Sequence, residues 1–377
     1  MNFNFNKKIN NFLKIILKNA LSQNLRVFFV GGIVRDNILN IPTIDIDLLL
    51  QGNAIEFASS LSSEIKIKSI HKDFCTVKLE YDDIIIDIAS SRTEFYPHSG
   101  CLPIVKEVGI PIEKDVKRRD FSINSLYCEL KLENEQIHYS LIDYADGIED
   151  IKNKTLKVLH DKSYIDDPTR IIRGLGFKYR FNFDFSDNDK KLINQYLNNI
   201  NYENMSIDRN KKVIKQVLNT AHQQELFKEL IEKKYYKLIN SSNLQVDYNL
   251  IDSIFNDFTL DMVSMSELYL KIIINNDIEK ISFANTTDIY KAFSKFNQID
   301  LMYYYYKTKD ENVKKYLKIK DIKLNISGND LIKKGFKEGA LIGEILNKLL
   351  EEKFNNPEKL NSKKNELEWV LKNYHKN

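Results

Sequence analysis

Residues 26–50, RVFFVGGIVRDNILNIPTIDIDLLL, decide the fold. The mainly apolar run Arg26–Val30 predicts a short strand. Gly31 and Gly32 follow at the turn into a helix, which we expect to begin at about residue 33. From Ile44 to Leu50, apolar and acidic residues alternate and then become wholly apolar, which predicts a second strand. The stretch therefore predicts a strand, a glycine turn, a helix and a second strand at the start of an α/β domain.

Two carboxylates stand side by side in the second of these strands. Asp45 and Asp47 point to one face, whereas Ile44, Ile46 and Leu48 point to the opposite face, which we expect to be buried. Neighbouring carboxylates repel each other, and a divalent cation relieves the conflict; hard oxygen ligands favour Mg²⁺. Taken alone, however, such a pair is more typical of an exposed strand end.

The surroundings of the pair favour a functional site. Free backbone N–H groups at Gly32 and the helix dipole are suited to phosphate oxygens, and Arg35 adds a cation on the first helical turn. On the strand Ile84–Ala89, Asp87 lies on the face opposite Ile84, Ile86 and Ile88, which makes a third carboxylate available. Together these are the parts of a two-metal nucleotidyl transfer site, in which the ions lie roughly 3.5–4 Å apart.

Length and composition limit the class of protein. The chain has 377 residues, too many for one compact domain, and its 43% hydrophobic and 11% aromatic residues exclude wholesale disorder. A net charge of +3 excludes a polycationic nucleic-acid coat but allows a locally basic groove. The three cysteines stand far apart, which argues against a zinc site or disulfide framework and for a reducing, cytoplasmic compartment.

The N-terminal residues 1–21 carry a lysine inside their apolar stretch and predict an amphipathic helix rather than a signal peptide. No apolar run approaches about 20 residues, so we expect no membrane partner.

The pattern of the chain changes about one third of the way along. Thr76–Tyr81 and Ile84–Ala89 flank Asp82 and Asp83, which predicts a hairpin. From about Asp120 helical periodicity dominates and strand signals almost vanish. We therefore expect an α+β protein with a small α/β head followed by an elongated, all-helical remainder. The expected division is a head over residues 1–135, a helical neck and body over 136–245, and a helical body and tail over 246–377.

Several motifs then occur in the order in which one known family has them. GGIVRD followed by DID closely resembles the signature of class II CCA-adding enzymes (tRNA nucleotidyltransferases) and bacterial poly(A) polymerases. The resemblance runs from about Arg26 to Leu350 and implies a nucleotidyltransferase head of the polymerase β-like kind with a helical neck, body and tail. The further matching blocks are KRRDFSINSL (Lys117–Leu126), DGIEDI (Asp146–Ile151), DDPTRIIRGLGF (Asp166–Phe177), MSIDR (Met205–Arg209) and ISGNDLIKKGFKEGALIGEIL (Ile326–Leu346).

The KRRD block is expected to open a helix at Arg119 and Asp120 and to bind the sugar and phosphates of a nucleotide. The resemblance implies that Arg119 contacts the nucleotide phosphate and Asp120 the ribose 2′-hydroxyl. Asn124, one helical turn later, is expected to support that site without touching substrate. In isolation this block would be interpreted as a surface salt-bridge cluster.

Asp167 and Arg170 are expected to choose the base. At a spacing of three on one helix they share a face and present an acceptor beside a fork of donors. Cytosine and adenine both place an amine donor beside a ring-nitrogen acceptor, whereas uracil and guanine reverse that order. The alternative is a helix-surface ion pair. Arg173 continues the face toward the triphosphate, but Gly176 stands where the family often has another arginine.

The last block combines glycines with lysines. Lys333, Lys334 and Lys337 surround Gly335 and Gly339, and the resemblance implies that this region holds the tRNA. Glycines at helix starts let backbone N–H groups approach phosphates, and lysines add sequence-independent attraction. The alternative is a pair of tightly packed helices that need small residues at their crossing.

The sequence as a whole predicts a template-independent tRNA nucleotidyltransferase. It would add C, A or both to the tRNA 3′ end from CTP and ATP and release pyrophosphate, with Asp45 and Asp47 holding Mg²⁺ and Asp87 as a further ligand. Addition of CC only or A only, a poly(A) polymerase, and an inactive tRNA-binding module remain open as alternatives.

Overall fold

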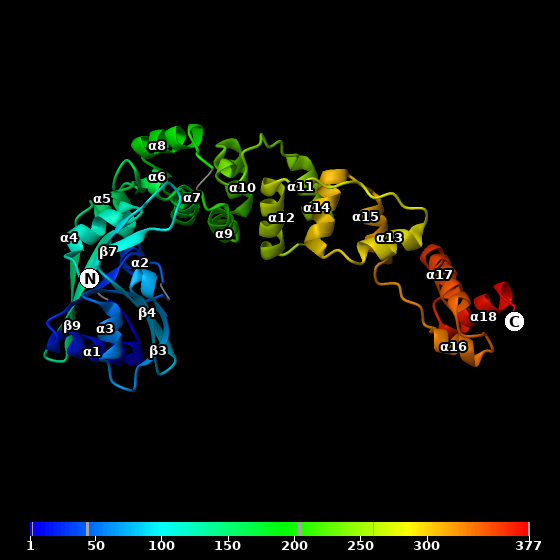
Figure 1. Ribbon diagram of the computed structural model, residues 1–377, viewed down its shortest axis with the longest axis horizontal. Coiled ribbons are helices and arrows are strands. Elements are labelled where there is room, and N and C mark those ends of the chain that lie inside the picture. Colours follow the sequence, from blue (N-terminus) through cyan, green and yellow to red (C-terminus); the bar gives the residue numbers. More distant parts are fainter. Residues whose placement is uncertain (2, 43–44, 203–204, 259, 376–377) are drawn as a thin grey trace. The chain divides into compact units, whose positions relative to one another are not determined.

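The computed structural model describes residues 1, 3–42, 45–202, 205–258 and 260–375. The chain divides into two compact units, Met1–Asn243 and Leu244–Asn377 (Figure 1). The first holds all the named strands, and the described part of the second is helical. Among the residues that the structure describes, no helix is both long and apolar enough to cross a membrane.

A seven-stranded mixed sheet forms the core of the first unit, in the order β3-β4-β5-β2-β1-β8-β9. Its strands are β1 (Arg26–Val30), β2 (Asp47–Gln51), β3 (Lys66–His71), β4 (Thr76–Tyr81), β5 (Ile84–Ser90), β8 (Leu126–Glu133) and β9 (Gln136–Asp143). β2 runs parallel to β5, and this register places Asp47 opposite Asp87. The predicted β4–β5 hairpin is confirmed, with Asp82 and Asp83 both at positive φ in its turn.

Helices cover this sheet. α1 (Lys7–Ser22) packs on β1 and β8, and α2 (Gly32–Ile38) contacts the same two strands. The amphipathic helix expected near the N-terminus is confirmed, because α1 buries one apolar face that includes Phe12, Leu13 and Ile16. α3 (Ala54–Ser59) packs on β4 and β5 (Figure 1).

One expectation about the head is wrong: strands continue after Asp120. β8 and β9 form a hairpin at the sheet edge, so the sheet extends to Asp143, beyond the head boundary expected at residue 135. β8 lies between β1 and β9, and both of its faces are buried over Leu126–Leu130. A strand buried on both faces lacks apolar–polar alternation and cannot be told from a buried helix by periodicity. Its one acidic residue there, Glu129, is neutralised by Arg26 at 2.7 Å.

The segment between β5 and β8 lines part of the cavity that holds the candidate active site. A two-stranded ribbon, β6 (Arg92–Phe95) and β7 (Ile104–Val108), is followed by α4 (Ile112–Asp115) and by two 3₁₀ turns, η2 (Val116–Arg118) and η3 (Ser122–Asn124). The helix expected to open at Arg119 and Asp120 is therefore not formed; the chain makes short turns before it enters β8.

The rest of the first unit is mainly helical, and α7 packs against α9 and α10. Its elements are α5 (Gly147–Lys152), β10 (Thr155–Leu156), α6 (Ser163–Asp166), α7 (Thr169–Phe181), β11 (Asp184–Phe185), α8 (Asp187–Asn198), α9 (Ile207–Leu218), α10 (Gln223–Glu232) and the 3₁₀ turn Tyr235–Leu238.

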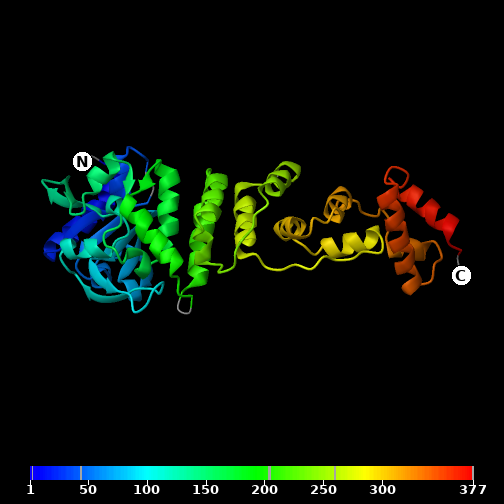
Figure 2. The same ribbon diagram turned by 90° about the horizontal axis from the view of Figure 1, so that it is seen from above.

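The second unit has no strand among its described residues, as Figures 1 and 2 both show. Its helices are α11 (Tyr248–Asp257), α12 (Met262–Ile274), α13 (Thr286–Phe293), α14 (Gln298–Thr308), α15 (Asn312–Ile319), α16 (Gly328–Lys333), α17 (Ala340–Asn355) and α18 (Lys363–Asn373). The predicted class, an α/β head followed by a largely helical remainder, is confirmed.

Candidate active site

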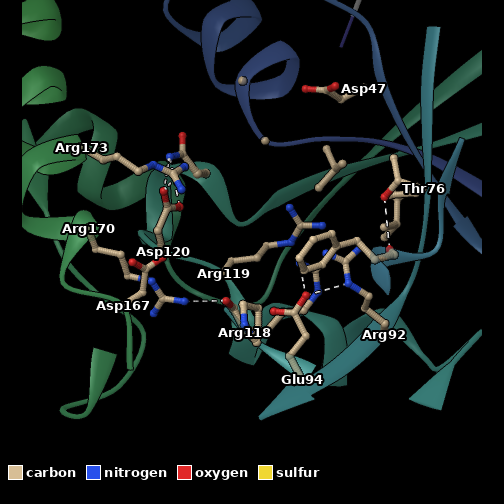
Figure 3. A pocket seen from close by; sticks show the side chains of 18 of the residues that line it. Asp47, Thr76, Arg92, Glu94, Arg118, Arg119, Asp120, Asp167, Arg170 and Arg173 are labelled. Atoms are coloured by element: carbon tan, nitrogen blue, oxygen red, sulfur yellow. Dashed lines mark hydrogen bonds and ion pairs between the residues drawn. The ribbon is translucent and has the colours of Figure 1, made fainter. Parts of the chain in front are cut away.

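One cavity of about 530 Å³ in the first unit, the head cavity, brings together most of the residues singled out by sequence. The head strands and turns supply one side, and α7 and α9 supply the other. Figure 3 shows Asp47 and Asp167 at opposite ends of this cavity. The predicted residues that line it are Gly32, Arg35, Asp47, Asp87, Arg119, Asp120, Asn124, Asp167, Arg170 and Arg173.

Acidic side chains form one end of the cavity, which Asp47 and Asp87 line, whereas Asp45, two residues before Asp47, is not among the lining residues. We call Asp45, Asp47 and Asp87 together the carboxylate end. Asp45 and Asp47 are exposed whereas Ile46 is buried, so the predicted alternation is confirmed; Ile44 lies outside the described residues. Asp47 and Asp87 are register partners on β2 and β5, and Lys78 pairs with Asp87 at 3.3 Å.

The carboxylates of this end repel one another. Although the surface of Asp47 is exposed, partial desolvation of its carboxylate, followed by the charges of Asp87 and Asp45, raises the pKa of Asp47. The described residues contain no ready-made group of three or more metal-binding side chains. The donor set nevertheless fits a hard divalent cation, because oxygen ligands that destabilise one another are stabilised by a shared positive charge.

The glycine turn, Gly31 and Gly32, borders the same end. Gly31 has φ of 72°, a conformation that favours glycine, and precedes α2. Its amide donates to the Leu126 carbonyl oxygen at 3.3 Å, which joins the turn to β8. Gly32 opens α2 at the cavity wall, so its backbone is placed as the sequence predicted.

Arg35 differs from expectation, because its side chain is buried and already bonded. Its Nε donates to Asp36 at 2.8 Å, and another of its nitrogens donates to the Asn124 amide oxygen. The guanidinium also lies over the rings of Phe181 and Phe177, at 4.5 and 5.3 Å. This arrangement favours orientation of Asn124 over direct contact with a phosphate.

Asp120 is buried in the middle of the cavity and is held from three sides. It accepts from the Phe121 amide at 2.8 Å and from Asn124 at 3.2 Å, and it pairs with Arg173 at 2.5 Å. Burial acts to raise the pKa of Asp120, but the charges of Arg173 and Arg170 outweigh it and lower the pKa. Asn124 thus links Arg35 to Asp120, a geometry consistent with the supporting role expected for it.

Arg119 lines the cavity from a fixed position. It donates to Asp115 at 2.8 Å and to the Tyr127 hydroxyl at 2.7 Å. Asp115 is fully buried and also accepts from the Arg118 Nε and the Arg92 amide, at 2.8 and 2.9 Å. Sequence reasoning missed Asp115; its spacing of four from Arg119 is the signal that could have found it.

Asp167 and Arg170, at the other end, are not on one helix as predicted. Asp167 follows the end of α6 with an extended backbone, and α7 begins at Thr169. The carboxylate accepts from the Thr169 amide and hydroxyl at 3.1 and 2.6 Å, and its second oxygen pairs with Arg209 at 2.6 Å. We call Asp167, Arg170 and Arg209 the arginine end of the cavity.

Arg170 is held by a different set of groups. It donates to the Ser163 hydroxyl, to the Arg118 carbonyl oxygen at 2.8 Å and to the Tyr96 hydroxyl at 3.5 Å. Asp167 and Arg170 are both buried and are bonded to other partners, so the interpretation as a surface ion pair is wrong. Arg209, which belongs to the MSIDR block, was not identified as a site residue from the sequence.

The lysine and glycine block of the second unit lies on its surface. Lys333, Lys334, Lys337 and both predicted glycines are exposed. A Cβ built on Gly328 would meet Ile342 at 3.2 Å, whereas one on Gly339 or Gly343 would meet nothing within 4 Å. Tight helix packing therefore explains Gly328 and does not explain Gly339 or Gly343.

Comparison with known proteins points to one family. Residues 27–157 match the family model of the poly A polymerase head domain. The A-adding tRNA nucleotidyltransferase of Aquifex aeolicus is 38% identical over 46% of this chain, but the match covers 21% of that protein. The CCA-adding enzyme of Ligilactobacillus salivarius is 26% identical over 89% of this chain and 90% of that enzyme. The chain spans about a fifth of the length of the A-adding relatives from Aquifex aeolicus and Geobacter sulfurreducens.

Solved structures of CCA-adding enzymes have a similar fold. The apo form II of a CCA-adding enzyme has a TM-score of 0.76 and 24% identity, covering 98% of this chain and 97% of that one. Residues 27–157 are thus similar to the head domain of poly A polymerases. The chain as a whole has the fold of CCA-adding enzymes, and the resemblance to the class II family inferred from its motifs is confirmed.

Proposed function

We propose that the protein is a template-independent tRNA nucleotidyltransferase that adds C and A to the tRNA 3′ end from CTP and ATP and releases pyrophosphate. One observation carries the proposal: a single cavity holds the carboxylates Asp47 and Asp87 and a glycine turn at one end, and the buried residues Asp167 and Arg170 at the other. The buried Asp120 lies between them. The triphosphate, the ribose and the base of one nucleotide would each be bound by a suitable group of this cavity.

Asp45 and Asp47 would hold Mg²⁺, with Asp87 beside them. The bound ion would stabilise charge on the attacking and leaving oxygens. The backbone at Gly32 and the side chains of Arg119 and Arg173 would bind the phosphates, and Asp120 would accept from the ribose 2′-hydroxyl. In this arrangement the RNA 3′-hydroxyl attacks the α-phosphorus; a new O–P bond forms as the bond to pyrophosphate breaks, and the hydroxyl proton passes to the carboxylate end.

The arginine end retains hydrogen-bonding capacity for a base. Each oxygen of Asp167 accepts from the protein, yet a carboxylate oxygen has two lone pairs, so an amine of C or A can still be bound. Arg170 uses its donors on Ser163, Arg118 and Tyr96, and a guanidinium carries five N–H groups. The pair can therefore recognise the base while remaining fixed by the protein.

Addition of A alone is the second candidate. The relatives from Aquifex aeolicus, Geobacter sulfurreducens and Halalkalibacterium halodurans, at 38, 37 and 34% identity, are all named A-adding tRNA nucleotidyltransferases. Their matches cover less than half of this chain. This observation favours A-only addition more than CC-only addition.

Extension assays separate these functions. Purified protein with Mg²⁺ is given tRNA transcripts that lack CCA, end in CC, or are complete, with CTP, ATP or both, and the products are sized at single-nucleotide resolution. A CCA-adding enzyme completes the first two substrates, whereas an A-adding enzyme extends only the CC-ended one. Long tails on unstructured RNA would favour a poly(A) polymerase, and no extension of any substrate would refute the proposal.

A further inference from the structure

A separate cavity of about 730 Å³ lies wholly within the second unit, and we call it the body cavity. The end of α11, the start of α14 and the second half of α15 supply most of its lining (Figure 1). It shares no lining residue with the head cavity. Sites for small molecules typically have volumes of about 300–1,000 Å³, so the body cavity is large enough to hold one.

Much of the lining of the body cavity is apolar and preformed. Leu301 and Met302 of α14 belong to it and are buried. Phe296 and Tyr316 also line it, and the centroid of each ring lies 5.8 Å from that of the fully buried Phe293. Aromatic rings that are held by a buried ring need little rearrangement when an apolar ligand binds.

The same lining carries an excess of positive charge. Lys314, Lys318 and Lys320 belong to it, against Asp257 as the one acid of the described lining, which gives a net charge of +2. Lys314 lies 3.8 Å from Asp257. Lys318 and Lys320 are exposed, and within the described part of the chain neither has an ion-pair partner within 4 Å. The dipole of α15 favours cations near its end, but it does not account for the apolar surface beside them.

We propose that the body cavity binds an amphipathic organic anion, that is, an apolar body of chain or ring carbon with one anionic group. The apolar body would lie against Phe296, Tyr316 and Met302, and the anionic group would pair with Lys318 and Lys320. Double-stranded RNA fits this lining less well, because it presents phosphates and 2′-hydroxyls and keeps its bases stacked inside. The site is separate from the head cavity and does not depend on the proposed function.

Fluorescence titration of the full chain with anilinonaphthalene sulfonate, which joins aromatic rings to one negative charge, tests the proposal. Lys318→Ala/Lys320→Ala should raise the Kd of this probe about tenfold, because it removes both unpaired cations. Gln298→Trp, at the exposed first residue of α14, should raise the Kd at least as much by filling the cavity. Lys291→Ala/Lys315→Ala is the matched control, because both lysines are exposed and lie outside the cavity, and its Kd should stay within about twofold of wild type.

Competition then identifies the apolar part of the ligand. Laurate and naphthoate present the same carboxylate on a chain and on a fused ring, so displacement of the probe by either one supports the proposal and distinguishes the two sources. An unchanged Kd in both cavity variants, or displacement by neither carboxylate, would overturn it. Displacement of the probe by a tRNA transcript would also overturn it, because the cavity would then be a site for RNA.

Discussion

The two ends of the head cavity are stabilised in opposite ways. At the arginine end every buried acid is matched by the protein itself, as Asp167 is by Arg209 at 2.6 Å. At the carboxylate end Asp47 faces Asp87 and Asp45, and among the described residues it has no ion-pair partner within 4 Å. The acid at the arginine end thus has its counter-charge, although among the described residues one buried nitrogen of Arg209 has no hydrogen-bond partner. The carboxylate end instead carries an excess of negative charge that a cation would balance.

This difference fits a division of work between the two ends in the proposed function. Fixed donors and acceptors in a water-poor site suit the recognition of a rigid base, because little rearrangement is needed on binding. Mutually repelling carboxylates suit the reacting centre, because their charge is available to a metal ion and the phosphates it accompanies. Substitutions at the two ends should therefore alter different measured properties.

The largest effect is expected at the carboxylate end. Asp47→Ala, and likewise Asp45→Ala, should lower nucleotide addition by at least about a hundredfold to a thousandfold, since it removes charge where the reaction develops it. Affinity for tRNA should be nearly unchanged, because it comes mainly from phosphate contacts elsewhere. Steady-state extension together with a tRNA binding curve checks this. Normal turnover in either variant would remove the metal-binding role from these residues.

The next largest effect is expected on folding stability, at the buried acid Asp115, which pairs with the cavity arginines Arg118 and Arg119. Asp115→Asn should lower the free energy of unfolding at pH 7 by about 3–5 kcal/mol, because it leaves Arg118 and Arg119 partly buried without their counter-charge. Urea denaturation measures this, with Asp187→Asn as control since Asp187 is 95% exposed.

The same variant has a signature in pH. Burial would raise the pKa of Asp115, but Arg119 and Arg118 hold it well below its usual range. The stabilisation is therefore present above the unfolded-state value of about 3.9 and is lost as the pH falls below it. Asp115→Asn should flatten this acid limb. An unchanged slope below about pH 4 would show that Asp115 is not the stabilising charge.

A smaller effect is expected on base choice. Asp167→Asn should reduce use of CTP and ATP by similar factors, about 5- to 150-fold, because a bidentate base contact contributes about 1–3 kcal/mol. UTP should become a comparatively better substrate. Asp166→Asn, next in sequence and facing His160, serves as control. A loss confined to CTP would contradict a pair shared by both bases.

The smallest effect belongs to the second unit. Replacing Lys333 and Lys337 by Ala should weaken tRNA binding severalfold. The slope of log K against log salt should become smaller by about one for each of these two lysines that contacts a phosphate. The KM for ATP should not change. Lys364→Ala is the control, because Lys364 is 84% exposed and lies on α18. Equal salt slopes in the variant and the control would remove the predicted RNA-binding role from these lysines.

Local patterns were enough to predict much of the site. The strand Arg26–Val30, the turn at Gly31, and the side of its own strand on which each of Asp47 and Asp87 lies all follow from periodicity over a few residues. The family's motifs added the residues of α7. These are features for which neighbouring residues determine the geometry.

Long-range pairing could not be predicted in the same way. Asp167 pairs with Arg209, which is 42 residues away, and Arg170 bonds to Arg118, 52 residues away. The strand β8 was missed because both of its faces are buried, which removes the alternation that marks a strand. Arg35 was assigned to phosphate because its burial against Phe181 and Asn124 depends on packing between separate elements.

One measurement tests the division between the two ends directly: titration of CTP and UTP, with and without Mg²⁺, into wild type, Asp47→Ala and Asp167→Asn. The account predicts that Asp47→Ala abolishes the Mg²⁺ dependence of nucleotide binding and keeps the preference for CTP over UTP. It predicts that Asp167→Asn loses that preference and keeps the Mg²⁺ dependence. If either substitution removed both properties together, the two ends would act as one site and the account would be wrong.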